Sequence, residues 1–88
     1  MKDFFAKTFR GYQFEFTRVI SASFDPWYHI TVKLNDVIVN FRMHSNKQGI
    51  WKITIDRLPG LLYSLETDFA ESILINEKPV DPNLLRRN

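Results

Sequence analysis

Three stretches of the chain place apolar and polar residues at alternating positions. Residues 12–23 begin with three aromatic residues separated by polar ones, and residues 27–34 and 37–44 repeat the alternation with clearly separated sides. Because successive side chains of a β-strand point to opposite faces, this period predicts three strands that are apolar on one side only. The residues expected to face the core are Tyr12, Phe14, Phe16, Tyr28, Ile30, Val32, Leu34, Val37, Val39, Phe41 and Met43.

Arg18 interrupts the first of these stretches, because by parity it falls on the side of the phenylalanines. Two arrangements would accommodate a charged residue at this position. Either Arg18 lies near the sheet edge and its guanidinium reaches water, or a β-bulge resets the register beyond it.

Turn residues separate the stretches. Asp25-Pro26 marks the first turn, and Asn35-Asp36 leaves only two residues between the second and third stretches. Asparagine and aspartate both accept the positive φ that a two-residue hairpin requires. We therefore expect consecutive strands to pair antiparallel.

A fourth strand is predicted to follow the loop Lys47-Gln48-Gly49. In a three-residue hairpin loop, glycine would occupy the position that needs a left-handed backbone. That register sets Met43 opposite Ile53, whereas a four-residue loop would set Met43 opposite Lys52. Turn chemistry and apolar pairing thus predict the same register.

Apolar residues then recur at steps of three and four, which predicts an amphipathic helix over residues 58–75. Asp56 is a candidate N-cap, although Pro59-Gly60 favours a later start. The end is also open, because residues 73–75 alternate and would suit a short closing strand. The acidic residues that lie off the apolar stripe, and are expected to face solvent, are Glu66, Asp68 and Glu71.

The first eleven residues fit two structures. Asp3 would cap a short helix that ends before Gly11, and the spacing of Phe4, Phe5 and Phe9 favours this helix. The alternative is a strand that turns at Arg10-Gly11.

Together these elements predict a two-layer α+β domain. Its sheet is a four-stranded antiparallel meander, packed on one face by a C-terminal helix and with room for a short N-terminal helix. The length of 88 residues suits one domain. We assign that domain to residues 1–80, and expect residues 81–88 to be a loose C-terminal tail.

Composition excludes several kinds of chemistry. The chain has no cysteine, which excludes disulfides, thiolate metal sites and a cysteine nucleophile. Nothing in the sequence approaches the roughly 20 apolar residues of a membrane span, and the charged N-terminal residues do not resemble a signal peptide. We therefore expect a cytoplasmic protein without a membrane partner.

Charge is distributed unevenly along the chain, although the net charge is only +2. Residues 1–57 carry nine Lys/Arg against five Asp/Glu, whereas residues 58–80 carry one lysine against four acidic residues. This polarity favours an anionic partner for the basic part, or head-to-tail contacts between copies.

The two hairpin registers also predict which polar side chains are neighbours on the uncovered sheet face, since directly opposite residues are in contact. The rows are Trp27–His44–Lys52, His29–Arg42–Thr54, Thr31–Asn40–Asp56 and Lys33–Ile38, with Glu15, Thr17 and Ser21 alongside on the first strand. The candidate binding residues are Trp27, His29, Lys33, Arg42, His44 and Lys52.

Four interpretations of this face are open. The first is a solvated outer surface, as many antiparallel sheets have. The second is a contact surface for a protein or a second copy, since exposed tryptophan and arginine are favoured anchors. The third is a weak binding site for single-stranded nucleic acid or an anionic ligand, through stacking and phosphate contacts, and the fourth is a catalytic or metal site.

The last interpretation is the weakest. The two histidines lie diagonally, about 7–8 Å apart, without an evident third metal ligand. Ser21, His29 and Asp56 include the residue types of a catalytic triad, but they fall on strands that are not all adjacent. We expect no catalytic residue, metal or cofactor. The sequence predicts a non-enzymatic binding module that contacts a protein or itself, with nucleic acid or an anionic ligand as the alternative.

Overall fold

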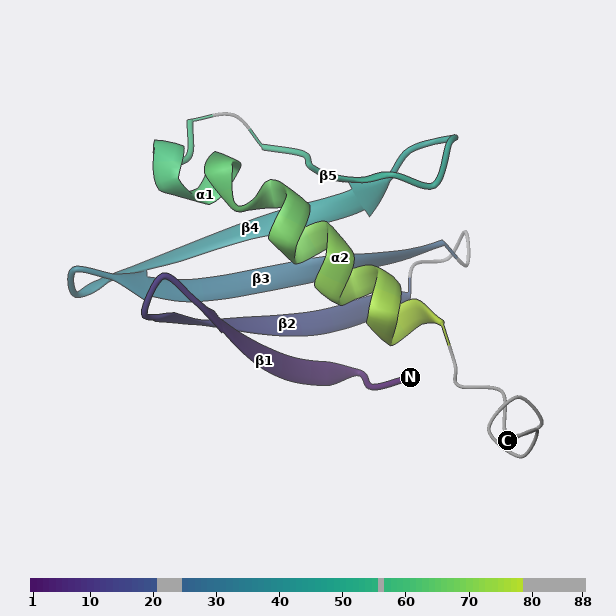
Figure 1. Ribbon diagram of the computed structural model, residues 1–88, viewed down its shortest axis with the longest axis horizontal. Coiled ribbons are helices and arrows are strands. Elements are labelled where there is room, and N and C mark those ends of the chain that lie inside the picture. Colours follow the sequence, from purple (N-terminus) through teal and green to yellow (C-terminus); the bar gives the residue numbers. More distant parts are fainter. Residues whose placement is uncertain (21–24, 56, 79–88) are drawn as a thin grey trace.

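The computed structural model describes residues 1–20, 25–55 and 57–78. It contains one antiparallel sheet in which each strand lies beside its neighbours in the chain (Figure 1). This confirms the predicted antiparallel sheet and C-terminal helix, but the sheet has five strands instead of four. The strands are β1 (Phe4–Phe9), β2 (Tyr12–Ile20), β3 (Pro26–Leu34), β4 (Val37–Ser45) and β5 (Trp51–Ile53).

The additional strand is the N-terminal segment, so the predicted short helix is wrong. Arg10 and Gly11 both have positive φ, 55° and 81°, and form the two-residue turn between β1 and β2. Phe5 then stacks on Phe16 with 4.6 Å between ring centroids. A four-residue spacing of apolar side chains suits a strand as well as a helix, and the pairing with β2 decides in favour of the strand.

Both predicted hairpin registers are confirmed. Leu34 pairs with Val37 across Asn35-Asp36, whose φ values are 47° and 68°. Met43 pairs with Ile53, and Gly49 has the left-handed φ of 80° that the three-residue loop requires. Asn46 also supports this loop, because its side-chain oxygen accepts backbone N–H groups from Gln48 and Ile50.

The predicted helix is present in two parts, α1 (Gly60–Ser64) and α2 (Glu66–Glu77), separated at Leu65. It begins directly after Pro59, whose ring cannot donate a hydrogen bond and suits a helix start. Residues 73–75 are helical, so the alternative of a closing strand is wrong. Asp56, the other candidate cap, and the predicted tail at 81–88 lie outside the described residues.

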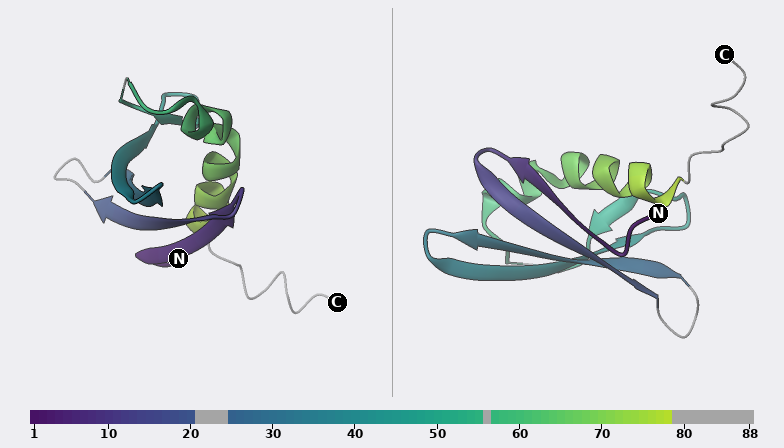
Figure 2. Two further views of the ribbon diagram at one scale, coloured as in Figure 1. Left: turned by 90° about the vertical axis from the view of Figure 1, so that its left-hand side faces the viewer. Right: turned by 90° about the horizontal axis from the view of Figure 1, so that it is seen from below.

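The core forms where α2 lies across the inner face of the sheet (Figure 2). Phe69 of α2 is fully buried, and its ring contacts four phenylalanine rings of β1, β2 and β4 at centroid distances of 4.8–6.0 Å. The four rings are those of Phe9, Phe14, Phe16 and Phe41.

Val37 was expected to face inward but is 61% exposed, because it lies at the tip of the β3–β4 hairpin.

Arg18 adopts neither of the two expected arrangements. The pairing of β2 with β3 continues through Arg18 without a bulge, so its side chain does lie on the helix face of the sheet. There it meets Glu77 at the end of α2, with Nε 2.6 Å and Nη2 3.3 Å from the two carboxylate oxygens. An arginine is tolerated on this face because a carboxylate from the helix satisfies it.

Glu77 and Asn76 extend this pair into a network at the end of α2. The Tyr28 hydroxyl donates to Glu77 and accepts a hydrogen bond from Asn76 Nδ2 at 2.8 Å. The Asn76 amide also bonds both the N–H and the C=O of Lys2, each at 2.9 Å, as a neighbouring strand would. The network therefore joins the N-terminus, two strands and the last helix.

Burial and the network act in opposite directions on Glu77. Burial alone would raise the pKa of its carboxyl, but the hydrogen bonds from Arg18 and Tyr28 and the guanidinium charge lower that pKa below its ordinary value of 4.5. Burial, together with the hydrogen bond to Glu77, raises the pKa of Tyr28 to about 12. Both groups therefore keep the protonation state that the network needs at neutral pH.

We predict that Glu77→Gln lowers the free energy of unfolding by about 1–3 kcal/mol, because Arg18 loses its counter-charge in a largely enclosed position. Urea denaturation at neutral pH measures this loss. Glu71→Gln, on the exposed side of α2, is the matched control and should have little effect.

Comparison of the wild type with Glu77→Gln also tests how stability depends on pH. A lowered folded-state pKa stabilises the fold fully above the ordinary value of 4.5, and this contribution disappears as the pH falls through the folded-state pKa. The wild type should therefore lose more stability than Glu77→Gln between neutral and acid pH. Parallel stability curves for the two proteins would contradict this role of Glu77.

Candidate functional site

Within the described ranges, the face of the sheet opposite α2 carries the residues that the sequence predicted for it, and the strand pairing places them in the predicted rows. Trp27 pairs with His44, His44 with Lys52, and His29 with Arg42. Strand β1 adds a residue that sequence analysis did not place there. Phe4 pairs with Thr17, which pairs with His29, so this 55% exposed phenylalanine continues the same row.

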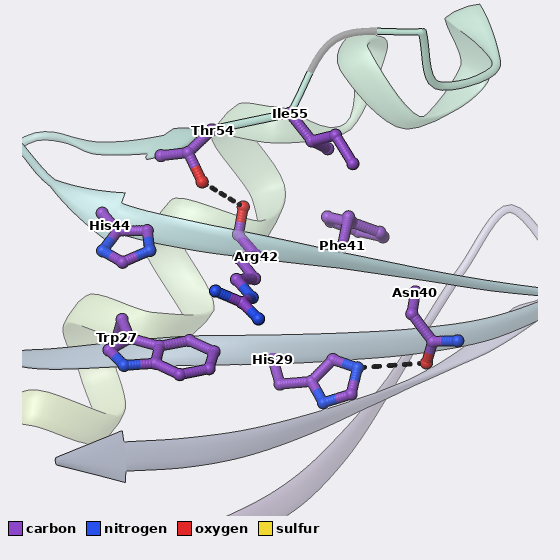
Figure 3. Close-up of a pocket in the computed structure, with 8 residues that line it drawn as sticks. All are labelled: Trp27, His29, Asn40, Phe41, Arg42, His44, Thr54 and Ile55. Carbon is purple, nitrogen blue, oxygen red and sulfur yellow. Dashed lines mark hydrogen bonds between the residues drawn. The ribbon is translucent and has the colours of Figure 1, made fainter. Parts of the chain in front are cut away.

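Trp27 is the centre of a stacked group on this outer face. The His44 ring lies nearly parallel to the indole, with 5.6 Å between centroids and 14° between planes. The guanidinium carbon of Arg42 lies 4.7 Å from the centroid of the indole ring. Both residues come from β4, and the register with β3 places them against Trp27 (Figure 3). Stacking and the cation–π contact hold the indole in one orientation.

His29 is oriented by a second set of contacts. Its Nε2 lies 3.0 Å from Asn40 Oδ1, and the Thr31 hydroxyl donates to the same oxygen at 2.7 Å. Because an amide oxygen only accepts hydrogen bonds, His29 donates from Nε2 in this contact. This leaves Nδ1 as the ring nitrogen that can interact with a ligand.

A hollow of about 460 Å³ opens between these groups. The hollow exists because β5 ends at Ile53 and the following Thr54 and Ile55 form its wall beside β4 (Figure 3). Among the described residues, its lining contains one arginine, two histidines and no aspartate or glutamate. The lining residues are Trp27, His29, Asn40, Phe41, Arg42, His44, Thr54 and Ile55.

Four of the six candidate residues therefore lie around one hollow, and two lysines lie apart from it. Lys33 Nζ is 3.9 Å from Asp36 at the hairpin tip, where both side chains are well exposed. Lys52 Nζ is 3.6 Å from the carboxylate of Glu66. Arg42, in contrast, has no carboxylate partner among the residues that the structure describes.

Glu66 differs from the expectation that it simply faces solvent. One carboxylate oxygen accepts the backbone N–H of Ile53 at 2.8 Å, and the other lies near Lys52. Since Thr54 N–H donates to Arg42 C=O on β4, the alternating Ile53 N–H points away from the sheet. Glu66 therefore covers the outer edge of β5.

Sequence reasoning missed four residues of the hollow as candidates, namely Asn40, Phe41, Thr54 and Ile55. Two of them, Asn40 and Thr54, stood in the predicted rows, so the register was the available signal. Ser21 and Asp56 were considered for catalysis, and both lie outside the described residues. In the described ranges, no three histidine, cysteine, aspartate or glutamate residues form a metal-binding cluster.

Fold and site together define a class of protein: a small α+β domain with one sheet face covered by helices and the other carrying an aromatic and cationic hollow. Comparison of the chain with protein-family models, curated proteins and solved structures finds no match. Among the described helices, none combines the length and apolar character needed to cross a bilayer.

We predict that Glu66→Ala accelerates hydrogen exchange of the Ile53 amide, because this N–H loses its acceptor at the edge of β5. Two-dimensional NMR after transfer to D₂O measures the rate. Asp68→Ala is the control, since it removes another acidic residue from the first turn of α2. Equal exchange of Ile53 in the two variants would show that Glu66 does not protect this edge.

Proposed function

We propose that this chain is a small non-enzymatic binding module whose outer sheet face contacts another protein. The observation that supports this most is the stacked group of Trp27, Arg42 and His44 beside an open hollow. Tryptophan and arginine are the residue types that most often anchor protein interfaces. Side chains that are already ordered lose less conformational freedom on binding.

The surroundings of the hollow also suit a protein partner. Large apolar side chains are exposed on the same face or at its margin: Phe4 is 55%, Ile38 64% and Ile55 45% exposed. Polar residues such as Thr17 and Asn40 lie between them. Exposed apolar side chains interspersed with hydrogen-bonding groups are typical of non-obligate protein interfaces.

We predict that Trp27→Ala abolishes capture of the partner. Tagged wild type, Trp27→Ala and the control Lys33→Ala, which changes the same face away from the hollow, are compared by affinity capture and quantitative mass spectrometry. A partner identified in this way is then purified and titrated. Its dissociation constant should rise at least about 30-fold with Trp27→Ala, as for an interface anchor, and little with Lys33→Ala.

Thermal denaturation of both variants confirms that they remain folded. If Trp27→Ala binds the purified partner as tightly as the wild type, the outer face is not the contact surface.

An anionic ligand is the second candidate, and one observation favours it. In the described part of the chain, the hollow is lined by Arg42 and two histidines without an acidic residue, and Arg42 has no carboxylate partner. The two lysines that would extend a track for a nucleic-acid backbone lie near Asp36 and Glu66. A single anionic group therefore fits this face better than a long polyanion.

We predict that any binding of a short oligothymidylate or inorganic phosphate weakens as salt is raised. It should disappear in Arg42→Ala and persist in Lys52→Ala. Tryptophan fluorescence at low salt measures it, because Trp27 lines the hollow. If neither anion changes the fluorescence of the wild type or binds by calorimetry at low salt, this second candidate fails.

A further inference from the structure

The two edges of the sheet are built differently. The edge at β5 is covered, because the Ile53 N–H donates to Glu66 at the start of α2. The edge at β1 has no paired strand among the described residues. Arg18 N–H donates to the carbonyl of Asp3 at 2.8 Å. Since backbone groups alternate in direction along an antiparallel strand, the N–H and C=O groups of Phe4, Ala6 and Thr8 point away from β2.

The open part of this edge begins at Phe4. The previous residue whose backbone groups point away from β2 is Lys2, and the side chain of Asn76 already bonds its N–H and C=O. No proline and no bulge interrupts the pairing of residues 4–9 with β2. An exposed, regular edge of this kind is a template for another strand.

A groove of mixed polarity lies beside the open edge, between β1 and α2. It has a volume of about 310 Å³, and its lining mixes apolar residues, Met1, Phe5 and Ile75, with three lysines, Lys2, Lys7 and Lys78. Ile75 is 68% exposed and Met1 is 59% exposed, although both are large apolar side chains. Ile75 of α2 and Met1 thus lie next to the strand edge that has no paired strand in the described part of the chain.

We propose that a second copy of this chain pairs with β1 through its own β1, antiparallel and around a twofold axis. The two five-stranded sheets would then be continuous, and the two grooves would meet beside the axis. A twofold contact uses the same surface on both copies, so the surface has to be complementary to itself. Asp3, directly before β1, and Lys7, within it, provide that complementarity when the contact is centred on Phe5.

In this register Phe5 lies opposite the partner's Phe5. Phe4 then exchanges two backbone hydrogen bonds with the partner's Ala6, and the twofold axis repeats them, so that only open edge groups are used. The pairing is limited to residues 3–7, because Asn76 already bonds Lys2, which this register sets opposite the partner's Thr8. Asp3 lies opposite the partner's Lys7, which gives two attractive charge pairs across the axis. Centring the contact on Ala6 would instead set Lys7 against the partner's Phe5 and leave the charges unmatched.

This dimer goes beyond the proposed function and does not depend on it. The pairing uses the edge of β1 and leaves Trp27, Arg42 and His44 accessible. A dimer therefore presents two outer faces on the same side of one continuous sheet. Loss of the outer-face contact would not dissociate it, which makes the two proposals separable by experiment.

Sedimentation velocity over a range of concentrations tests the proposal with two proline variants. Both Ala6→Pro and Thr8→Pro remove an N–H that points away from β2, so both keep the β1–β2 pairing. Of these two N–H groups, only that of Ala6 donates a hydrogen bond to the partner strand in the register centred on Phe5. We expect the wild type and Thr8→Pro to be dimers and Ala6→Pro to be a monomer, with circular dichroism confirming that all three are folded.

Charge reversal tests the register independently of proline. Asp3→Lys or Lys7→Asp alone places like charges opposite each other at two positions and should raise the dissociation constant about tenfold or more. The combination of Asp3→Lys with Lys7→Asp restores attraction and should return the constant to within a few-fold of the wild type.

Three outcomes overturn the proposal. One is a wild type that remains monomeric at high micromolar concentration. Another is a double charge variant that associates no better than the single ones. The third is a dimer that Trp27→Ala dissociates, because the outer face would then be the self-association surface.

Discussion

The ion pair between Arg18 and Glu77 is the contact on which the two layers depend at the end of α2. A cation on the helix face of the sheet needs a counter-charge, and the helix supplies it 59 residues later in the chain. Tyr28 adds a hydrogen bond to Glu77, and Asn76 adds one to Tyr28. Among the described residues, no buried side-chain nitrogen or oxygen lacks a hydrogen bond. The network thus fixes where α2 ends and which sheet face it covers.

The position of α2 determines where binding can occur. With the phenylalanine-rich face of the sheet packed against Phe69, the opposite face is the one that displays Trp27 and its neighbours. The same antiparallel register that buries Tyr28 and Met43 places Trp27 against His44. Core and candidate site are therefore two sides of one pairing pattern, and a slip of one residue would exchange them.

Much of the sheet was predictable because its determinants are local. The two- and three-residue turns at Asn35-Asp36 and Lys47–Gly49 specify their registers, and those registers correctly predicted the rows on the outer face. The first eleven residues were ambiguous for a physical reason. The separation of Phe5 from Phe9 brings both side chains to one side in a strand and in a helix alike.

Features that depend on distant residues were not predictable from pattern alone. The partner of Arg18 comes from the other end of the described chain, and no local rule connects it with Glu77. The hollow arises because β5 stops after three residues, whereas alternation in the sequence gave no reason for it to end there. The contact of Glu66 with Lys52 and Ile53 requires α2 to lie beside β5, which periodicity alone does not specify.

The order of the elements along the chain has a consequence for synthesis. All five strands precede α2, so during translation they leave the ribosome before the element that covers their inner face. Neighbouring strands pair through short connections such as Arg10-Gly11, and such local contacts form rapidly. The nascent sheet therefore carries an uncovered phenylalanine-rich surface until residues 66–77 are made. This interval is when the chain most needs a chaperone or a low local concentration of copies of itself.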